Sequence, residues 1–250
     1  MKQKANRKRL DFLLVERGVA ESSQKATAMI LAGEVLVDGQ PAGKAGAPVA
    51  ADARVEVTSR AQKFVSRGGT KLEGALADFS IDPTGRVCLD IGSSHGGFTD
   101  CLLQHGAKRV YAVDVNVEQL DWKLRKDPRV IRIERNAREL HVEDVADGVD
   151  LVVIDVSFIS VCKVIAPAQS LAKPSADLLI LIKPQFELRR EEIGKGGIVR
   201  DQALHEKAII AVREFAESIG LACGGVRPSH LLGAEGNQEY FLHARKKALG

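Results

Sequence analysis

The segment 87–100 constrains the fold of this chain more than any other. An apolar stretch at 87–91 is followed by Gly92 and a turn of small residues, after which a helical pattern begins. Glycine permits sharp turns and lets a ligand approach the main chain closely. A second apolar stretch at 109–113 ends at Asp114, about twenty residues further on, where doubly wound sheets bind a ribose. The sequence therefore predicts a nucleoside-cofactor site in a doubly wound α/β sheet.

The glycine pattern is weakly specific by itself, because a tight strand–helix turn without a ligand would look the same. It lacks the Gly-Lys-Ser/Thr ending of a phosphate-binding P-loop. Ser94 also stands where a dinucleotide-binding turn would have its second glycine, so a pyrophosphate would fit poorly. A cofactor with a ribose and no phosphates suits the turn better, and S-adenosylmethionine is the obvious one.

The composition is that of a globular protein with a sizeable core, since 45% of the 250 residues are hydrophobic. The first nine residues are basic and polar with no apolar run behind them, and no apolar stretch is long enough to span a bilayer. The four cysteines show no paired spacing, and no two of the six histidines have metal-ligand spacing. We therefore expect a cytoplasmic protein with reduced thiols, no membrane partner and no metal.

The charge is uneven along the chain. Residues 1–71 contain thirteen Lys and Arg against seven Asp and Glu, a net charge of +6, whereas the whole chain carries +3. The remainder is therefore slightly acidic, at −3. A basic N-terminal part on a near-neutral body suggests an anionic partner held by that part, although an unused charge asymmetry is the plain alternative.

Strand and helix patterns alternate from residue 87 onward. The predicted strands are 87–91, 109–113, 130–133, 151–155, 178–183, 221–227 and 239–244, and the predicted helices are 98–105, 117–124, 160–172 and 201–219. This alternation predicts a Rossmann-like, doubly wound, mostly parallel seven-stranded sheet. A small α+β module precedes it, so the expected domains are 1–60 and 71–250, joined by a linker at 61–70.

The N-terminal module has two short helical patterns followed by strands. Its Arg9-Leu10-Asp11-x-x-Leu14 segment and the pattern Ser22-x-x-x-Ala26-x-x-x-Ile30-x-x-Gly33-x-Val35-x-Val37-x-Gly39 resemble the S-four RNA-binding domain. The family often has arginine after the capping serine, where this chain has Ser23. One phosphate contact is therefore in doubt, and Lys25 could replace it.

Four polar residues sit where apolar elements begin or end: Lys71, Asp155, Lys183 and Glu239. Strand ends converge on one crevice in a doubly wound sheet. Together with Asp90-x-Gly92, this set resembles the FtsJ-like family of RNA ribose 2′-O-methyltransferases. Further matches are Ser66-Arg67-Gly68-Gly69-x-Lys71-Leu72, Val153-Ile154-Asp155-Val156-Ser157-Phe158, Ile182-Lys183-Pro184-Gln185-Phe186-Glu187 and Gly196-Gly197-x-Val199-Arg200-Asp201. With the S-four module, nearly all of 7–244 resembles the TlyA family, whose members are also named haemolysins.

The resemblance implies a class I methyltransferase fold and a role for each matched residue. Lys183 would be the base or polariser of a ribose 2′-hydroxyl in ribosomal RNA, positioned by Lys71 and Asp155, with Glu239 holding the hydroxyl or a lysine. The implied S-adenosylmethionine contacts are Asp90, Gly92, Ser93, Ser94, Gly96, Gly97, Phe98, Asp114, Val115, Asn136, Ala137 and Asp155. Expected RNA contacts are Arg7, Lys8, Arg9, Ser22, Lys25 and Arg67. For Asp114, a helix cap for 117–124 is the structural alternative.

Two other functions remain open from the sequence. One is a membrane-damaging haemolysin, which the missing signal and spanning segments argue against. The other is a catalytically silent RNA-binding or ribosome-assembly factor, which the complete set of four polar residues argues against. The family suggests a cytidine as the target, whereas the modified nucleotide, the ribosomal subunit and the oligomeric state are left undetermined.

Overall fold

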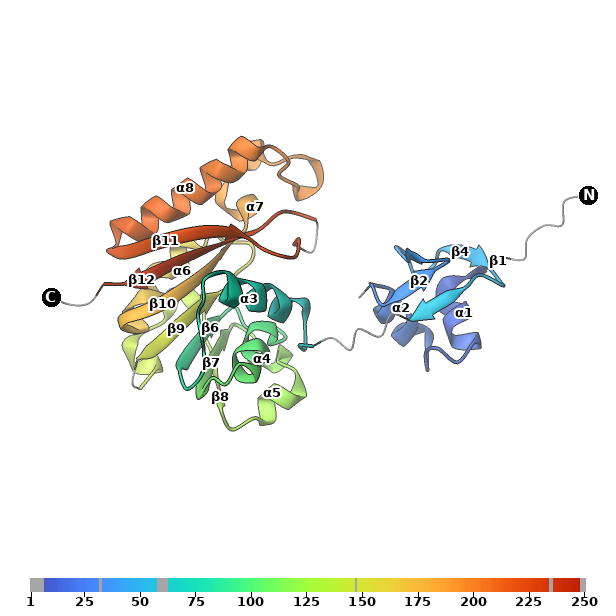
Figure 1. Cartoon of the computed structure of the whole chain (residues 1–250), viewed down its shortest axis with the longest axis horizontal. Coiled ribbons are helices and arrows are strands. Elements are labelled where there is room, and N and C mark those ends of the chain that lie inside the picture. The colour runs from blue at the N-terminus through green and yellow to red at the C-terminus, as the bar shows by residue number, and fades with distance from the viewer. Residues whose placement is uncertain (1–6, 32, 58–62, 147, 234–235, 248–250) are drawn as a thin grey trace, which may run out of the picture. The chain divides into compact units, whose positions relative to one another are not determined.

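The computed structural model describes residues 7–31, 33–57, 63–146, 148–233 and 236–247. It divides the chain into two compact units, residues 1–62 and 63–250 (Figure 1). Each unit has its own buried core, and we describe each separately.

The first unit is a small α+β module. Its elements are β1 (Arg7–Arg9), α1 (Leu10–Glu16), α2 (Ser23–Leu31), β2 (Val35–Val37), β3 (Gln40–Pro41), β4 (Pro48–Ala50) and β5 (Val55–Val57). Leu10 and Leu14 of α1 pack against Ala26 and Ile30 of α2 and against Val35, because each helix carries its apolar residues on one face. The strands form an antiparallel β3-β2-β5 sheet and a separate β1-β4 pair.

The second unit is built on one seven-stranded sheet with the order β8-β7-β6-β9-β10-β12-β11. Its strands are β6 (Val87–Ile91), β7 (Arg109–Asp114), β8 (Val130–Glu134), β9 (Val149–Ile154), β10 (Ala172–Ile182), β11 (Leu221–Pro228) and β12 (Tyr240–Lys246). All neighbouring pairs are parallel except those of β12, which runs antiparallel to β10 and β11. The fold predicted from the sequence, a mostly parallel seven-stranded sheet, is confirmed.

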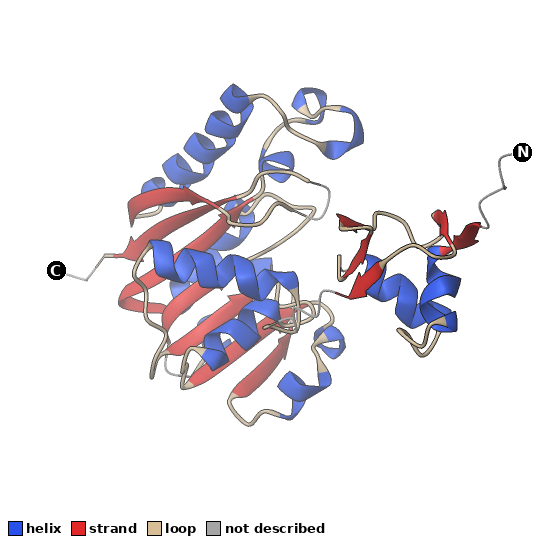
Figure 2. Ribbon diagram, turned by 45° about the vertical axis from the view of Figure 1, so that its right-hand side comes forward, coloured by secondary structure: helices blue, strands red, loops and turns tan. Residues whose placement is uncertain are grey.

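Helices cover both faces of this sheet (Figure 2). The longer ones are α3 (Arg67–Asp78), α4 (Gly97–Gln104), α6 (Cys162–Leu171) and α8 (Gln202–Ser218), with α5 (Trp122–Lys126) and α7 (Pro184–Glu187) as short ones and 3₁₀ turns at 117–119, 137–139, 142–144, 190–192 and 195–197. Apolar residues of α3 and α4 share one core cluster, and those of α6 and α8 share the other. Neighbouring residues of β10 alternate between these clusters, as a strand covered on both faces requires.

The topology fixes where a ligand can bind. From β6 the chain continues to β7 on one side and later returns to β9 on the other, so the carboxyl ends of β6 and β9 flank a switch point in strand order. Loops leaving such neighbours diverge and leave a crevice between them. The turn after β6 and the residues after β9 both lie there.

Three sequence expectations need correction. The expected linker 61–70 is too long, because residues from Lys63 onward belong to the second unit, with Phe64 buried and α3 beginning at Arg67; residues 61 and 62 lie outside the described part. Lys71, where the sequence predicts the start of a helix before the first strand, therefore lies inside α3. The single helix expected at 117–124 is a 3₁₀ turn followed by α5, because Leu120 is extended and buried in the core between them.

Candidate active site

The turn after β6 can be formed only with a glycine at position 92. Gly92 has a φ of +84°, and a Cβ there would lie 2.2 Å from the carbonyl oxygen of Asp155. The backbone N–H groups of Gly92 and Ser93 both donate to the carbonyl oxygen of Val113, at 2.9 and 3.0 Å. The turn is thus hydrogen-bonded to β7 on one side and packs closely against the residue that follows β9 on the other.

Two cavities meet at this turn. The larger, of about 380 Å³, is lined by Asp114 at the end of β7, by Val115 after it, by Asn136 and Ala137 after β8, and by residues 155–159. The smaller, of about 190 Å³, is lined by Ser93, Gly97 and Phe98 together with residues of α3. Gly92, Ser94 and Asp155 line both cavities, so the two form one crevice at the carboxyl ends of the strands.

The structure brings most of the predicted cofactor residues to this crevice. Asp114 accepts hydrogen bonds from the backbone N–H of Ser94 at 2.9 Å and of Asn116 at 3.1 Å. Asn116, not Asp114, caps the following 3₁₀ turn, so the helix-cap alternative for Asp114 is wrong. Asn136 lines the larger cavity, although its side-chain oxygen also caps the turn at 137–139.

Two of the predicted cofactor residues, Asp90 and Gly96, do not line either cavity. Gly96 has a φ of +92°, and a Cβ there would lie 2.2 Å from Leu124 of α5, so its role is in the turn itself. Asp90 is fully buried, because its side chain points from β6 into the layer of α4, where Thr99 Oγ1 donates to it at 2.6 Å. Its other oxygen has no hydrogen-bond partner among the described residues.

Burial raises the pKa of the Asp90 carboxyl to about 7, from an ordinary value of 3.8. The unfolded chain then loses this proton near pH 4 and the folded chain near pH 7, so Asp90 destabilises the fold progressively over that interval. This difference of about three pH units corresponds to roughly 4 kcal/mol of unfolding free energy.

We expect Asp90→Asn to become more stable than the wild type as the pH rises from 4 to 7. Above pH 7 the difference in unfolding free energy between the two proteins should stay constant. Urea unfolding across this range measures it, with the exposed Glu143→Gln as control. A difference independent of pH would contradict the expectation.

The four polar residues that the sequence singled out form two ion pairs, Lys71 with Glu239 and Lys183 with Asp155. Lys71 Nζ lies 2.5 Å from Glu239 Oε2, and both residues are buried. Lys183 Nζ lies 2.5 Å from Asp155 Oδ1, but this oxygen has no hydrogen-bond partner, so the contact is electrostatic and poorly aligned. Lys183 instead donates to Ser157 Oγ at 2.8 Å.

The smaller cavity connects the two pairs. Lys71 of one pair and Asp155 of the other both line it, and the turn 92–98 lies beside them. Arg67, one helical turn before Lys71, lines the same cavity and donates to the carbonyl oxygen of Leu232 at 3.2 Å. A crevice with a glycine turn, a ribose-type carboxylate and two lysine–carboxylate pairs can bind a nucleoside and act on a hydroxyl group.

Sequence reasoning assigned no role to several residues at this site. Ser157 accepts from Lys183, and Phe158 lines the larger cavity with its ring 5.3 Å from that of Phe186. His95 lines the smaller cavity. The segment 155–158 directly follows a strand end, which is the signal that could have singled out Ser157 and Phe158.

Glu187 connects the two loops that carry Asp155 and Lys183. It ends α7, which begins directly after Lys183, and its carboxylate accepts from Ser160 Oγ at 2.6 Å and from the backbone N–H of Val161 at 2.8 Å. Burial raises the pKa of this carboxyl. Glu187 therefore fixes the loop after β9 to α7, the short helix that begins directly after Lys183.

Replacing Glu187 with alanine should leave two donors without their acceptor and loosen this loop. We expect a loss of stability of about 1–3 kcal/mol and a kcat about tenfold lower, because Ser157 and Asp155 are no longer fixed against Lys183. Urea unfolding and steady-state kinetics measure the two effects. Glu191→Ala, at an exposed position a few residues on, is the control. An unchanged kcat with reduced stability would restrict Glu187 to a structural role.

The predicted RNA contacts in the first unit are partly engaged within the chain. Lys8 pairs with Glu16 at 2.6 Å, and Arg9 pairs with the buried Asp11 at 2.7 Å. Ser22 is a helix cap, because its Oγ accepts from the backbone N–H of Lys25 at 3.1 Å. The side chains of Arg7 and Lys25 are exposed or partly exposed, and Ser23 lies 3.5 Å from Asp11.

Comparison with known families agrees with this architecture. A family model described as FtsJ-like methyltransferase matches residues 64–246, and one described as S4 domain matches residues 8–55. The second unit is therefore an FtsJ-like methyltransferase domain, and an S4 domain precedes it.

Relatives match nearly the whole chain. The 16S/23S rRNA (cytidine-2′-O)-methyltransferase TlyA of Mycobacterium tuberculosis is 46% identical over 96% of this chain and 91% of its own length. Hemolysin A of Brachyspira hyodysenteriae is 43% identical over 94% of this chain and 98% of its own. A solved structure from Streptococcus thermophilus, described as a candidate hemolysin, has a TM-score of 0.76 at 38% identity and covers 97% of this chain and 90% of that one. The chain belongs to the TlyA family of FtsJ-like methyltransferases.

Proposed function

We propose that this methyltransferase transfers a methyl group from S-adenosylmethionine to a ribose 2′-hydroxyl of ribosomal RNA, with a cytidine as the target. The observation that carries the proposal is the convergence of two lysine–carboxylate pairs on the cavity beside the turn 92–98. The TlyA relative named above supports the choice of rRNA and of cytidine.

The crevice fits S-adenosylmethionine in shape and in chemistry. Gly92 lines both cavities, and the buried Ser93 hydroxyl has no hydrogen-bond partner among the described residues. Asp114 would accept from the ribose hydroxyls, with Val115, Asn136 and Ala137 around the adenine and Phe98 on the methionine side. When bound, the cofactor supplies a methyl group on a positively charged sulfur.

The residues of the two pairs would prepare the hydroxyl. A ribose hydroxyl is a weak nucleophile and needs a group that takes its proton or stabilises the charge on its oxygen. Lys183 is that group in our proposal, held in place by Asp155 and Ser157. Lys71 and Glu239 would hold the ribose in line, and Arg67 at the same cavity would bind a neighbouring phosphate.

RNA is the substrate in this proposal because only RNA carries the 2′-hydroxyl. The S4 domain would bind its phosphates through exposed basic residues such as Arg7 and Lys25. Such binding weakens steeply with salt, because Lys and Arg release counterions from the nucleic acid and this release is less favourable at a high salt concentration. The partners proposed here are ribosomal RNA or ribosomal subunits.

Labelled S-adenosylmethionine and ribosomal subunits from cells lacking the gene test this proposal. We expect the full-length protein to transfer the label, and mapping of the product to locate it on a ribose 2′-oxygen. RNA with a 2′-deoxyribose at the mapped position should accept no label. Transfer to a base, to DNA or to no substrate at all would contradict the proposal, and the last result would favour a silent RNA-binding factor.

The hemolysin names among the relatives raise membrane damage as a second activity. In the part of the chain that the structure describes, no helix has the length and apolar character needed to cross a membrane. No specific observation at the crevice favours this activity. Leakage from liposomes with the purified protein would detect it.

A further inference from the structure

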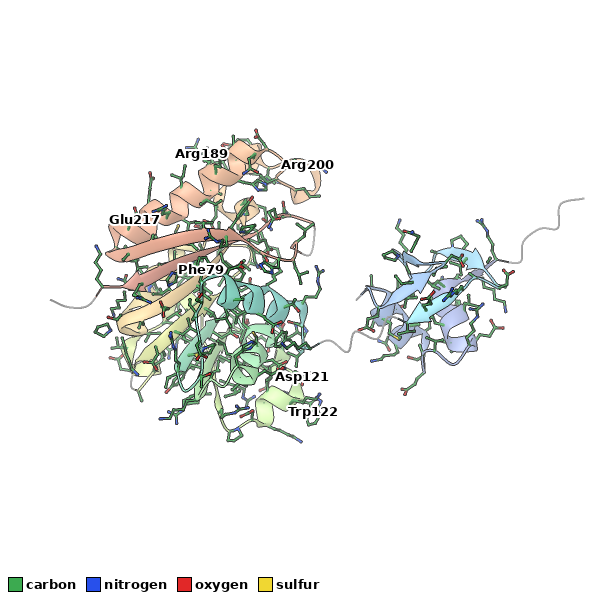
Figure 3. All side chains as sticks on the ribbon, in the orientation of Figure 1. Phe79, Asp121, Trp122, Arg189, Arg200 and Glu217 are labelled. Carbon is green, nitrogen blue, oxygen red and sulfur yellow. The ribbon has the colours of Figure 1, made fainter. Side chains whose placement is uncertain are left out.

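Helix α5 presents an exposed tryptophan beside the crevice. Trp122 is the single tryptophan of the chain, and 57% of its surface is exposed (Figure 3). The Lys126 ammonium lies 5.2 Å from the centre of its indole ring. An exposed indole offers a flat apolar face on which an unpaired base can stack.

The surroundings of Trp122 are positively charged. Residues 118–132 include five Lys and Arg and three Asp and Glu. Arg125 and Arg132 both pair with the carboxylate of Glu118, at 2.8 Å each. Lys123 and Lys126 are exposed and, among the described residues, neither is in an ion pair. The charges of Lys123 and Lys126 are therefore not neutralised by a carboxylate in the described part of the chain, and both can attract an anion to this surface.

The helix is fixed directly to the turn that lines the crevice. Leu124 is buried, and its side chain fills the space that a Cβ on Gly96 would occupy. The backbone N–H of Asp121 donates to the carbonyl oxygen of His95 at 3.2 Å, and His95 lines the smaller cavity. Asp121 also caps α5 by accepting from the backbone N–H of Lys123 at 2.9 Å. The tryptophan thus stands on a rigid support that adjoins the cavity.

We propose that Trp122, Lys123 and Lys126 form a contact surface for single-stranded RNA, which we call the α5 surface. An unpaired base stacks on the indole, and the two ammonium groups bind the adjoining phosphates. Aromatic rings bind unpaired bases in this way without requiring a particular sequence, and lysine supplies the phosphate contact. The α5 surface extends the crevice and orients the RNA strand that enters it. The inference rests on the proposed function, because it takes RNA as the substrate.

The single tryptophan makes the test direct. A single-stranded RNA oligonucleotide added to the full-length protein should quench the indole fluorescence saturably, whereas a duplex of the same length, whose bases are already stacked, should quench it much less.

Trp122→Ala should weaken the affinity for the single strand about tenfold, which matches the loss of one stacked base. Trp122→Phe should restore most of it, and Lys123→Ala with Lys126→Ala should weaken binding and reduce its salt dependence. Ile210→Ala, at an exposed position on α8, is the control.

The outcomes separate this inference from the proposed function. If rRNA is methylated but Trp122→Ala binds RNA with wild-type affinity and the fluorescence does not change, the α5 surface is not an RNA contact and the reaction stands. If purified ribosomal proteins, and not RNA, alter the fluorescence, the α5 surface binds protein and the inference is wrong. If the fluorescence is quenched by RNA but no RNA is methylated, the contact surface stands and the proposed reaction fails.

Discussion

Replacing Lys183 with alanine should lower kcat for methyl transfer by roughly 10²- to 10⁴-fold, the range expected when a proton-transfer group is lost. The Lys183 nitrogen lies 2.5 Å from Asp155 Oδ1 and 2.8 Å from Ser157 Oγ, and both of these residues line the larger cavity. It lines neither cavity, so binding of S-adenosylmethionine should be unchanged. Single-turnover transfer to ribosomal subunits measures the first effect, and calorimetry with the cofactor measures the second.

The chain offers a matched control for this substitution. Lys173 and Asp150 form an ion pair at 2.9 Å between the same two strands, β9 and β10, near their amino ends. Lys173→Ala removes a lysine–aspartate pair from the same part of the sheet without touching the crevice. We expect its kcat to stay close to that of the wild type. Equal losses in the two variants would mean that Lys183 supports the sheet and does not act on the substrate.

The alternation of strands and helices made the position of this site predictable. Once the sheet is parallel, the carboxyl ends of the strands at 87–91, 109–114 and 149–154 must lie at one edge. Asp114, the last residue of its strand, and Asp155, the first residue after its strand, both lie there. Asp90 shows the limit of that reasoning. It belongs to the strand and not to the turn after it, so its side chain points into a helix layer and is buried.

Glycines explain why the start of the second unit was misjudged. The Arg67-Gly68-Gly69 segment resembles a flexible joint in composition, yet it is the first turn of α3. A Cβ on Gly69 would lie 2.3 Å from the Phe64 side chain, so this glycine permits close packing and not flexibility. A flexible linker and a closely packed first helical turn can have the same glycine-rich composition, and only the tertiary contacts distinguish them.

Contacts between distant residues were also beyond the sequence. Arg67 donates to the carbonyl oxygen of Leu232, and Glu187 accepts from the loop at 160–161, so both contacts join residues that are far apart in the sequence and that no helix or strand period relates. Their geometry depends on how the chain turns back on itself. The sequence could therefore indicate the edge of the sheet where chemistry occurs, but not which side chains fix its loops.

The second large effect should appear at the buried pair of Lys71 and Glu239. Glu239→Ala leaves the Lys71 ammonium without its partner at a position where the lysine side chain is only 10% exposed. An unpaired buried charge costs about 3–5 kcal/mol of stability, which exceeds the effect of an exposed pair several-fold. Methyl transfer should fall as well, because Lys71 lines the smaller cavity. Urea unfolding and single-turnover transfer measure the two losses, and Glu217→Ala, from an exposed pair on α8, should change neither noticeably.

A double substitution separates the contribution to stability from the contribution to the reaction. Lys71→Met with Glu239→Leu replaces the ion pair by apolar side chains of similar size, and such replacements commonly restore or exceed the original stability. We expect this variant to unfold at a higher urea concentration than Glu239→Ala while its methyl transfer stays low. Activity that recovers with stability would make the pair a structural element of the fold. Stability that recovers alone would assign Lys71 and Glu239 to the positioning of the ribose, because a loosened fold would then no longer explain the low activity.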